Sequence, residues 1–245
     1  MNKKLNEKEQ KAQKVFFDSL KIYPVRSPFR NRNGIPPRGI TSNGVYPRKT
    51  KIPVIAAMVG SVGSGKSTIS RFIAQLIKGT VIQGDKIRVL LRRQKCGYES
   101  VREITKNTLV GIISKGGNAV LDSDYGPIKK KGMLSDIAKK FGAKVFYIQT
   151  YADRDIIIGR LINAKYSPKS FSGGAGSVWT GKNKGAVVAI REFWRMTPRN
   201  YKSNNKEPLN FILKKFPFIN FKVDTSDEKK WKKEAKKIAK EILKF

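Results

Sequence analysis

The chain has 245 residues, of which 52 are lysine or arginine and 18 are aspartate or glutamate, giving a formal net charge of +34. It has no histidine and one cysteine, Cys96, which excludes histidine catalysis, histidine metal sites and an internal disulfide. The charge favours a polyanionic ligand, such as nucleic acid, an anionic surface or phosphorylated compounds. The sequence has no apolar run of membrane-spanning length, so we expect a cytoplasmic protein without membrane contact.

The first 51 residues are expected to form a basic arm ahead of the folded domain. Residues 1–20 could form a charged helix, whereas residues 21–51 are rich in Pro, Gly, Asn and Arg and have no periodicity. Such a composition is typical of disordered or linker segments. The predicted domain therefore covers residues 52–245, and contact between the arm and nucleic acid is left open.

The segment AAMVGSVGSGKSTIS, residues 56–70, carries the most specific pattern in the chain. It satisfies G-x-x-x-x-G-K-[ST] with Gly60, Gly65, Lys66 and Ser67. Residues 52–59 before it predict a strand buried on both faces of a parallel sheet, and the apolar spacing after it predicts a helix. Strand, loop and helix thus follow in the order of a phosphate-binding P-loop.

The residue types of this loop indicate a nucleoside triphosphate as the ligand. Glycines let successive N–H groups surround phosphate, and the helix N-terminus adds further donors. Lys66 would reach the β- and γ-phosphates of ATP, and Ser67 would bind Mg²⁺. The predicted nucleotide site comprises Gly60, Ser61, Val62, Gly63, Ser64, Gly65, Lys66, Ser67 and Thr68. The sequence does not separate ATP from GTP.

Downstream, short apolar strands alternate with helices. Strands are expected at 80–84, 118–122, 143–149 and 218–224, and helices at 98–115, 131–141, 153–165 and 227–244. Thr225 and Glu228 are expected to form the capping box of the last helix. The alternation predicts an α/β fold with a doubly wound parallel sheet, similar to the core of nucleoside monophosphate kinases.

The alternation breaks in an insertion at about 166–210. Its first half is glycine-rich and basic, and AVVAIREFWRMTPRNYK then predicts a short helix that ends before Pro198. Long insertions in compact domains are usually functional or disordered, and we expect a lid here. Arg191 and Arg195 would share a helix face with aromatic neighbours, a pattern that suits base stacking or a buried aromatic pair beneath a solvated basic face.

Two carboxylate positions follow predicted strands, at the edge where doubly wound sheets bind ligands. In VIQGDKIRVLL, Asp85 could accept the proton of an acceptor hydroxyl, and Arg88 could bind the acceptor or transition-state charge. An ordinary surface ion pair is the alternative. In NAVLDSDY, Asp122 is the expected Mg²⁺ carboxylate, with Asp124 as its competitor and a simple turn as the other reading.

A P-loop followed by a strand and D-x-x-R resembles the zeta-toxin-like kinases and the kinase domain of polynucleotide kinases, and GDKIR is similar to adenylylsulfate kinases. The resemblance covers roughly residues 52–165 and the last strand and helix. It implies that Asp85 is the catalytic base and that Arg88 contacts substrate. It also implies an R-L-x-x-R phosphate clamp. Arg160 begins this motif but its second arginine is missing, and Lys165, Arg191 or Arg195 could substitute.

Together these patterns predict an ATP- and Mg²⁺-dependent kinase in which Lys66, Asp85, Arg88 and Arg160 act on the reacting groups. The acceptor would be a hydroxyl of a small molecule or of a polynucleotide 5′ end. The alternative is a nucleic-acid-binding NTPase whose only phosphate acceptor is water.

Overall fold

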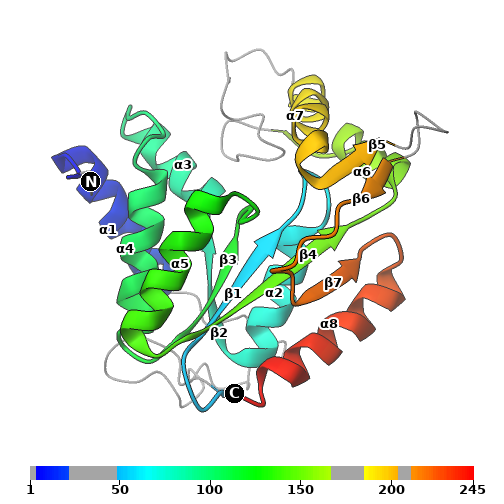
Figure 1. The fold of residues 1–245 in the computed structure, drawn as a ribbon. Helices are drawn as coiled ribbons and strands as arrows, with labels where there is room; N and C mark the ends of the chain where they lie inside the picture. Colours follow the sequence, from blue (N-terminus) through cyan, green and yellow to red (C-terminus); the bar gives the residue numbers. More distant parts are fainter. Residues whose placement is uncertain (1–3, 22–48, 167–184, 204–210) are drawn as a thin grey trace, which may run out of the picture.

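The structure is a computed structural model that describes residues 4–21, 49–166, 185–203 and 211–245 (Figure 1). A five-stranded sheet with the order β2-β3-β1-β4-β7 forms its centre, and every neighbouring pair is parallel. Its strands are β1 (Val54–Val59), β2 (Gly79–Gln83), β3 (Asn118–Asp122), β4 (Lys144–Tyr151) and β7 (Phe221–Asp224). The predicted doubly wound parallel sheet is confirmed.

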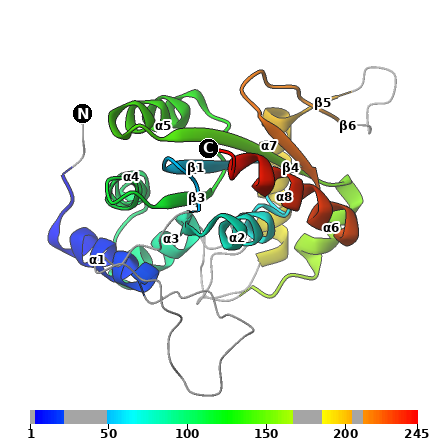
Figure 2. The same ribbon diagram turned by 90° about the horizontal axis from the view of Figure 1, so that it is seen from below.

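Helices cover both faces of this sheet (Figure 2). One face carries α2 (Lys66–Ile77) and α8 (Glu228–Ile242), and the other carries α3 (Gly84–Arg93), α4 (Val101–Ile113) and α5 (Ile128–Phe141). The short α6 (Arg154–Ile162) packs against α7 (Gly185–Asn200) at the end of the molecule where β4 finishes. The chain thus forms three layers, with the sheet between two sets of helices.

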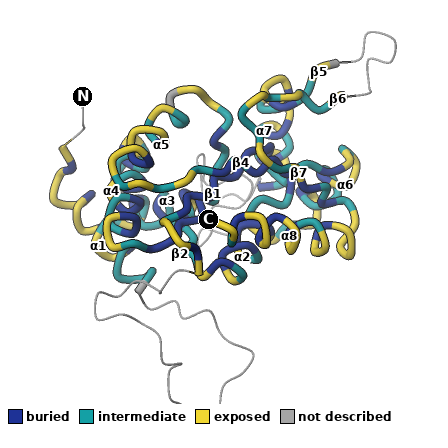
Figure 3. Tube along the Cα trace, turned by 60° about the horizontal axis from the view of Figure 1, so that its bottom comes forward, coloured by how far each residue is buried: buried dark blue, intermediate teal, exposed yellow. Residues whose placement is uncertain are grey.

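The apolar run of β1 follows from its central place in the sheet. All six of its side chains are buried, because successive residues point to opposite faces and both faces are covered. Ile55, Ala57 and Val59 join the core under α3, α4 and α5. Val54, Ala56 and Met58 join the core under α2 and α8. The burial tube in Figure 3 shows β1 dark along its length and the outer helix faces exposed.

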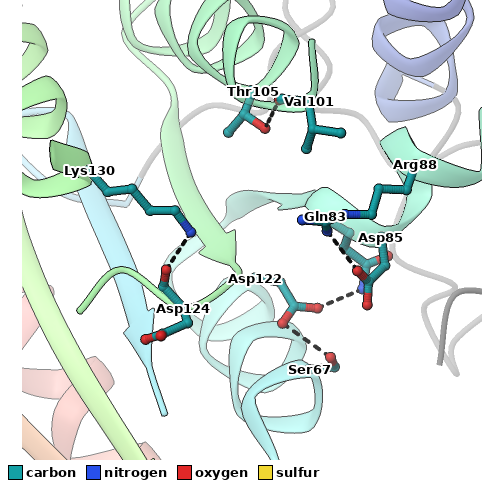
Figure 4. Close-up of polar contacts among 9 residues, drawn as sticks. All are labelled: Ser67, Gln83, Asp85, Arg88, Val101, Thr105, Asp122, Asp124 and Lys130. Carbon is teal, nitrogen blue, oxygen red and sulfur yellow. Dashed lines mark hydrogen bonds and ion pairs between the residues drawn. The ribbon is translucent and has the colours of Figure 1, made fainter. Parts of the chain in front are cut away.

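The strand order reverses direction at the carboxyl end of β1, which is where open α/β sheets form their ligand crevice. From β1 the chain passes to β2 on one side, returns to β3 and then continues to β4 on the other side of β1. The loops after β1 and after β3 therefore lead to opposite sides of β1, and such a divergence leaves room for a ligand at the carboxyl ends of the strands. The P-loop follows β1, Asp85 follows β2, and Asp122 ends β3, and Figure 4 shows Ser67, Asp85 and Asp122 near one another.

The helix expected within residues 1–20 is present as α1 (Glu7–Lys21), and it is packed onto the domain. Phe16 is fully buried against the core beside α3 and α4. At the start of α1, the side chains of Asn6 and Glu9 each accept a hydrogen bond from the other's backbone N–H at 2.9 Å, which is a reciprocal cap. Residues 4–21 therefore share the domain core, while residues 1–3 and 22–48 of the predicted arm lie outside the described residues.

Two expected helix ends are wrong. The side chain of Asp227, not Thr225, caps α8 by accepting a hydrogen bond from the Lys230 N–H at 3.0 Å. Helix α7 continues past Pro198 to Asn200, because a proline in the last turn removes only one backbone hydrogen bond. A hairpin of β5 (Tyr201–Ser203) and β6 (Phe211–Leu213) follows, which the sequence patterns did not predict.

The apolar side chains of α8 that recur at helical spacing lie in the core, and they are Trp231, Ala235, Ile238 and Ile242. The glycine-rich half of the insertion lies outside the described residues, so its role as a lid stays a prediction. In the described part of the chain, every helix is too short or too polar to cross a bilayer.

Candidate active site

The P-loop runs from the end of β1 into α2, and the neighbouring strands leave space only for glycine at its ends. Gly60 has φ +147°, and a Cβ there would lie 2.5 Å from the Thr150 carbonyl oxygen. Gly65 has φ +83°, and its Cβ would lie 2.9 Å from Cγ2 of Thr225. Both backbone conformations strain other residues. The loop is thus fixed in shape by the ends of β4 and β7.

The first turn of α2 faces this loop. Its N-cap is Gly65, which offers no side-chain hydrogen bond to the N–H groups that open the helix. Such a helix start is a ready anion site, because its donors and dipole both favour negative charge. The Lys66 ammonium donates to the carbonyls of Gly60 at 3.0 Å and Ser61 at 2.5 Å. Burial lowers the pKa of Lys66, and nearby aspartates, Asp124 foremost, oppose that shift.

Ser67 and Asp122 meet as a pair of oxygen ligands (Figure 4). The Ser67 hydroxyl donates to Oδ1 of Asp122 at 3.1 Å, and Gln83 Nε2 donates to the other carboxylate oxygen at 3.0 Å. Asp124 instead accepts hydrogen bonds from the N–H groups of Gly60 and Gly126 at 3.3 and 3.1 Å. Asp122, and not its competitor, therefore lies next to the P-loop serine.

The Ser67–Asp122 pair suits Mg²⁺ in a phosphate-binding site better than a metal whose ligands all come from protein. The described ranges contain no group of three or more His, Cys, Asp or Glu side chains that could hold a metal. Mg²⁺ in phosphate-transfer sites needs only one or two protein oxygens, because phosphates and water complete its octahedron. Ser67 and Asp122 supply that minimum.

Asp85 and Arg88 lie on the first turns of α3, across the crevice from the P-loop. Arg88 Nη1 is 2.9 Å from Asp85 Oδ1, as the three-residue spacing on a helix allows. Burial among protein atoms raises the pKa of Asp85, while Arg88 lowers it. Because the Asp85 side chain is 58% exposed, water screens this effect in the free site. The effect grows when ligands displace that water.

Arg160 of α6 lies beside the P-loop but is bound to protein groups. Its Nη1 donates to the Thr225 hydroxyl at 2.9 Å and to the Gly63 carbonyl at 3.3 Å, and its Nη2 donates to the Thr225 carbonyl. The guanidinium thus joins α6, the loop and the end of β7. Arg195 is one of the residues that could replace the missing second arginine of the R-L-x-x-R clamp. Its guanidinium forms an ion pair with Glu192 at 2.6 Å.

Two contributors to this site were missed by sequence reasoning. Thr225, expected as a helix cap, is buried, and its hydroxyl donates to the Ser64 carbonyl at 3.2 Å and the Tyr151 carbonyl at 3.1 Å. Lys130 donates to the Asp124 carbonyl at 2.5 Å. The lysine run after the predicted metal strand was the only signal for Lys130, and one residue in a lysine-rich chain is a weak signal.

The sequence matches no known family model and no curated protein. Solved structures do share its architecture. A provisionally assigned kinase from Chloroflexus aurantiacus is 13% identical, with 78% of this chain and 97% of that chain covered at a TM-score of 0.52. The chain has the fold of P-loop kinases. The protein APE1195 is 16% identical over 79% of this chain and 98% of its own, with a TM-score of 0.50.

Shikimate kinase from Bacteroides thetaiotaomicron also matches, at 14% identity over 77% of this chain and 98% of that chain, but its TM-score of 0.45 is too low to carry an argument. At such identities the likeness concerns the fold alone.

Proposed function

We propose that this protein is an ATP-dependent phosphotransferase that moves the γ-phosphate to an alcohol. The observation that carries the proposal is the position of Asp85. A carboxylate held by Arg88 at 2.9 Å lies near the Ser67–Asp122 pair (Figure 4) and interacts electrostatically with the P-loop lysine, Lys66. A protein that only hydrolyses ATP needs to position water, whereas D-x-x-R next to a P-loop suits activation of an acceptor hydroxyl.

Each group has a role in this reaction. The N–H groups of residues 60–68 and the Lys66 ammonium would bind the phosphates, in place of the carbonyls that Lys66 now contacts. Asp85 would take the hydroxyl proton, and Arg88 would orient that carboxylate and balance charge on the acceptor. Arg160 would bind phosphate oxygen only by giving up Thr225, so its first role here is to hold the loop.

Ser67 and Asp122 would hold Mg²⁺, Ser67 directly and Asp122 either directly or through water. When bound, the ion neutralises charge on the transferring phosphate. Gln83 keeps the Asp122 carboxylate turned toward Ser67 through its hydrogen bond. We favour the kinase group that contains the zeta-toxin-like and polynucleotide kinases, because Asp85 and Arg88 come directly after the first strand that follows the P-loop helix.

The test is transfer of labelled γ-phosphate from ATP to a metabolite pool and, separately, to a 5′-hydroxyl oligonucleotide. Asp85→Asn should keep nucleotide affinity and lose about 10²- to 10⁴-fold in transfer, as expected for loss of a general base. Label in small molecules that disappears in the variant would support a metabolite kinase, and label on the oligonucleotide would support a polynucleotide kinase. Free phosphate alone, equal in both proteins, would contradict the proposal in favour of an NTPase.

A further inference from the structure

A basic cluster lies beside the proposed acceptor position and has no part in the nucleotide roles described above. Its members are Arg88 on α3, Arg102 on α4 and Lys130 on α5. Figure 4 places Lys130 on one side of the crevice and Asp85 with Arg88 on the other, with Val101 and Thr105 above and Asp122 below. Arg102, which follows Val101 on α4, lies near enough for its charge to act on both Lys130 and Tyr125, so the three cations come from three helices.

Close packing fixes the walls of this place. A Cβ on Gly84, at the start of α3, would lie 2.7 Å from the Ser123 hydroxyl and 3.2 Å from Arg88 Nη1. The first turn of α3 is therefore pressed against the loop after β3. In the same loop, the buried Tyr125 ring lies 5.0 Å below the Lys130 ammonium.

The cations are close enough to act on one another. Burial lowers the pKa of Lys130 although Asp124 opposes it, and the positive charges of Arg88, Lys66 and Arg102 lower it further. Burial also raises the pKa of Tyr125, and there Arg102 and Arg88 act in the opposite direction. The positive charges of Arg88, Arg102 and Lys130 therefore repel one another across the space beside the loop.

Binding of a neutral acceptor would make this repulsion worse. Lys130 donates to the carbonyl of Asp124, while the Asp124 carboxylate accepts from loop N–H groups. An uncharged ligand would strip water from a half-buried ammonium without replacing it by negative charge, which is costly. An anionic ligand group would be bound by charge-assisted hydrogen bonds and would relieve the repulsion.

We propose that the acceptor is a small hydroxyl compound that carries its own phosphate, sulfate or carboxylate group, which Lys130 and Arg102 bind while the hydroxyl meets Asp85. This deepens the proposed function and rests on it for the hydroxyl, but not for the anion site. A polynucleotide fits less well, because its phosphates need a groove that follows the strand, whereas these cations converge from three elements.

The anion site is tested first by binding alone. The protein is saturated with Mg²⁺ and a non-hydrolysable ATP analogue, so that the P-loop is filled, and sulfate, methyl phosphate or acetate is then titrated by calorimetry. Wild type should bind one of these anions. Lys130→Met should weaken that binding about tenfold or more, as loss of a charged hydrogen bond does, and Lys130→Arg should retain it. Lys139→Met, exposed on the same helix, should match wild type.

Absence of anion binding in wild type, or equal binding by Lys130→Met, would overturn the proposal. So would a parallel loss of analogue and anion in Lys130→Met, because Lys130 would then only support the loop through Asp124. These binding measurements do not depend on turnover. The proposed anion site can therefore be contradicted while the proposed kinase activity is supported, and the kinase activity can be contradicted while the anion site is supported.

Transfer to matched acceptors completes the test. Glycerol is compared with glycerol phosphate, and a hexose with its aldonic acid and its phosphate ester. The charged member of each pair should have the higher kcat/KM. Lys130→Met should reduce that preference by raising the KM for the charged acceptor, while the KM for ATP stays unchanged. Equal use of neutral members, or label only on a 5′-hydroxyl oligonucleotide, would overturn the small anionic acceptor.

Discussion

Asp85 and Arg88 form a pair in which one residue sets the protonation of the other. As the proposed base, Asp85 must be ionised, and Arg88 favours the ionised form and so lowers the pKa of Asp85. Removing Arg88 leaves burial and the Asp122 charge, which raise that pKa, opposed only by the charge of Lys66. Arg88→Leu should therefore move the acid limb of the kcat/KM–pH profile to higher pH. An unchanged or lower limb would exclude Asp85 as the titrating base.

Lys66 is the P-loop side chain whose loss should cost most. Its ammonium is ready to leave the carbonyls of Gly60 and Ser61 for phosphate oxygens. Lys66→Met should reduce turnover about 10²-fold or more, because a charge that stabilises the transferring phosphate is gone. Steady-state kinetics with ATP measures this, with Lys139→Met as the control. Activity within tenfold of wild type would show that the loop binds no reacting phosphate.

Thr225 holds the P-loop from beneath. Its buried hydroxyl contacts the Ser64 and Tyr151 carbonyls and receives a hydrogen bond from Arg160. Thr225→Val keeps the shape but removes the hydroxyl that contacts the Ser64 carbonyl and accepts a hydrogen bond from Arg160, while the Tyr151 carbonyl keeps its hydrogen bond from the backbone N–H of residue 225 at 2.8 Å. The free energy of unfolding should therefore fall by about 1–3 kcal/mol, and ATP affinity should drop. Thr225→Ser retains the hydroxyl and should keep both. Denaturant unfolding and nucleotide titration compare the two variants, and equal behaviour would contradict the role.

At the scale of elements, α1 is the outermost layer over the helices that carry the proposed base and part of the basic cluster. It packs against α3 and α4 through Phe16, which is fully buried. Phe16→Ala should lower the free energy of unfolding by about 3–5 kcal/mol. Val15→Ala, on the neighbouring 44% exposed side chain, should change it by less than about 0.5 kcal/mol. Equal effects in urea unfolding would mean that α1 is not docked in solution.

At the scale of the whole molecule, the net charge of +34 opposes the compact state. Self-repulsion between exposed lysines is screened by salt over about 10 Å at 0.1 M. Raising NaCl from low to moderate concentration should therefore raise the midpoint of thermal unfolding. A falling midpoint would show that screened ion pairs contribute more than the repulsion. The control is an uncharged osmolyte, whose effect should not follow ionic strength.

The sequence alone determined the local framework. Gly60, Lys66 and Ser67 identify the P-loop because few sequences satisfy so many fixed positions, and the six apolar residues of β1 are explained only by a strand covered on both sides. Strand and helix alternation followed from periodicity, which depends on neighbours in the chain. Where an end depended on one hydrogen bond, as at Asp227 and Pro198, periodicity gave the wrong residue.

Only the tertiary structure decided which distant residues share the site. Asp122 was separated from Asp124 by its contact with Ser67, 55 residues away in the chain. Thr225 changed from a helix cap to a support of the P-loop, because β7 ends beneath Gly65. Lys130 was one lysine among many until the order of the strands brought α5 opposite α3. Such contacts depend on how the elements cross in space, and that information does not reside in any single stretch of sequence.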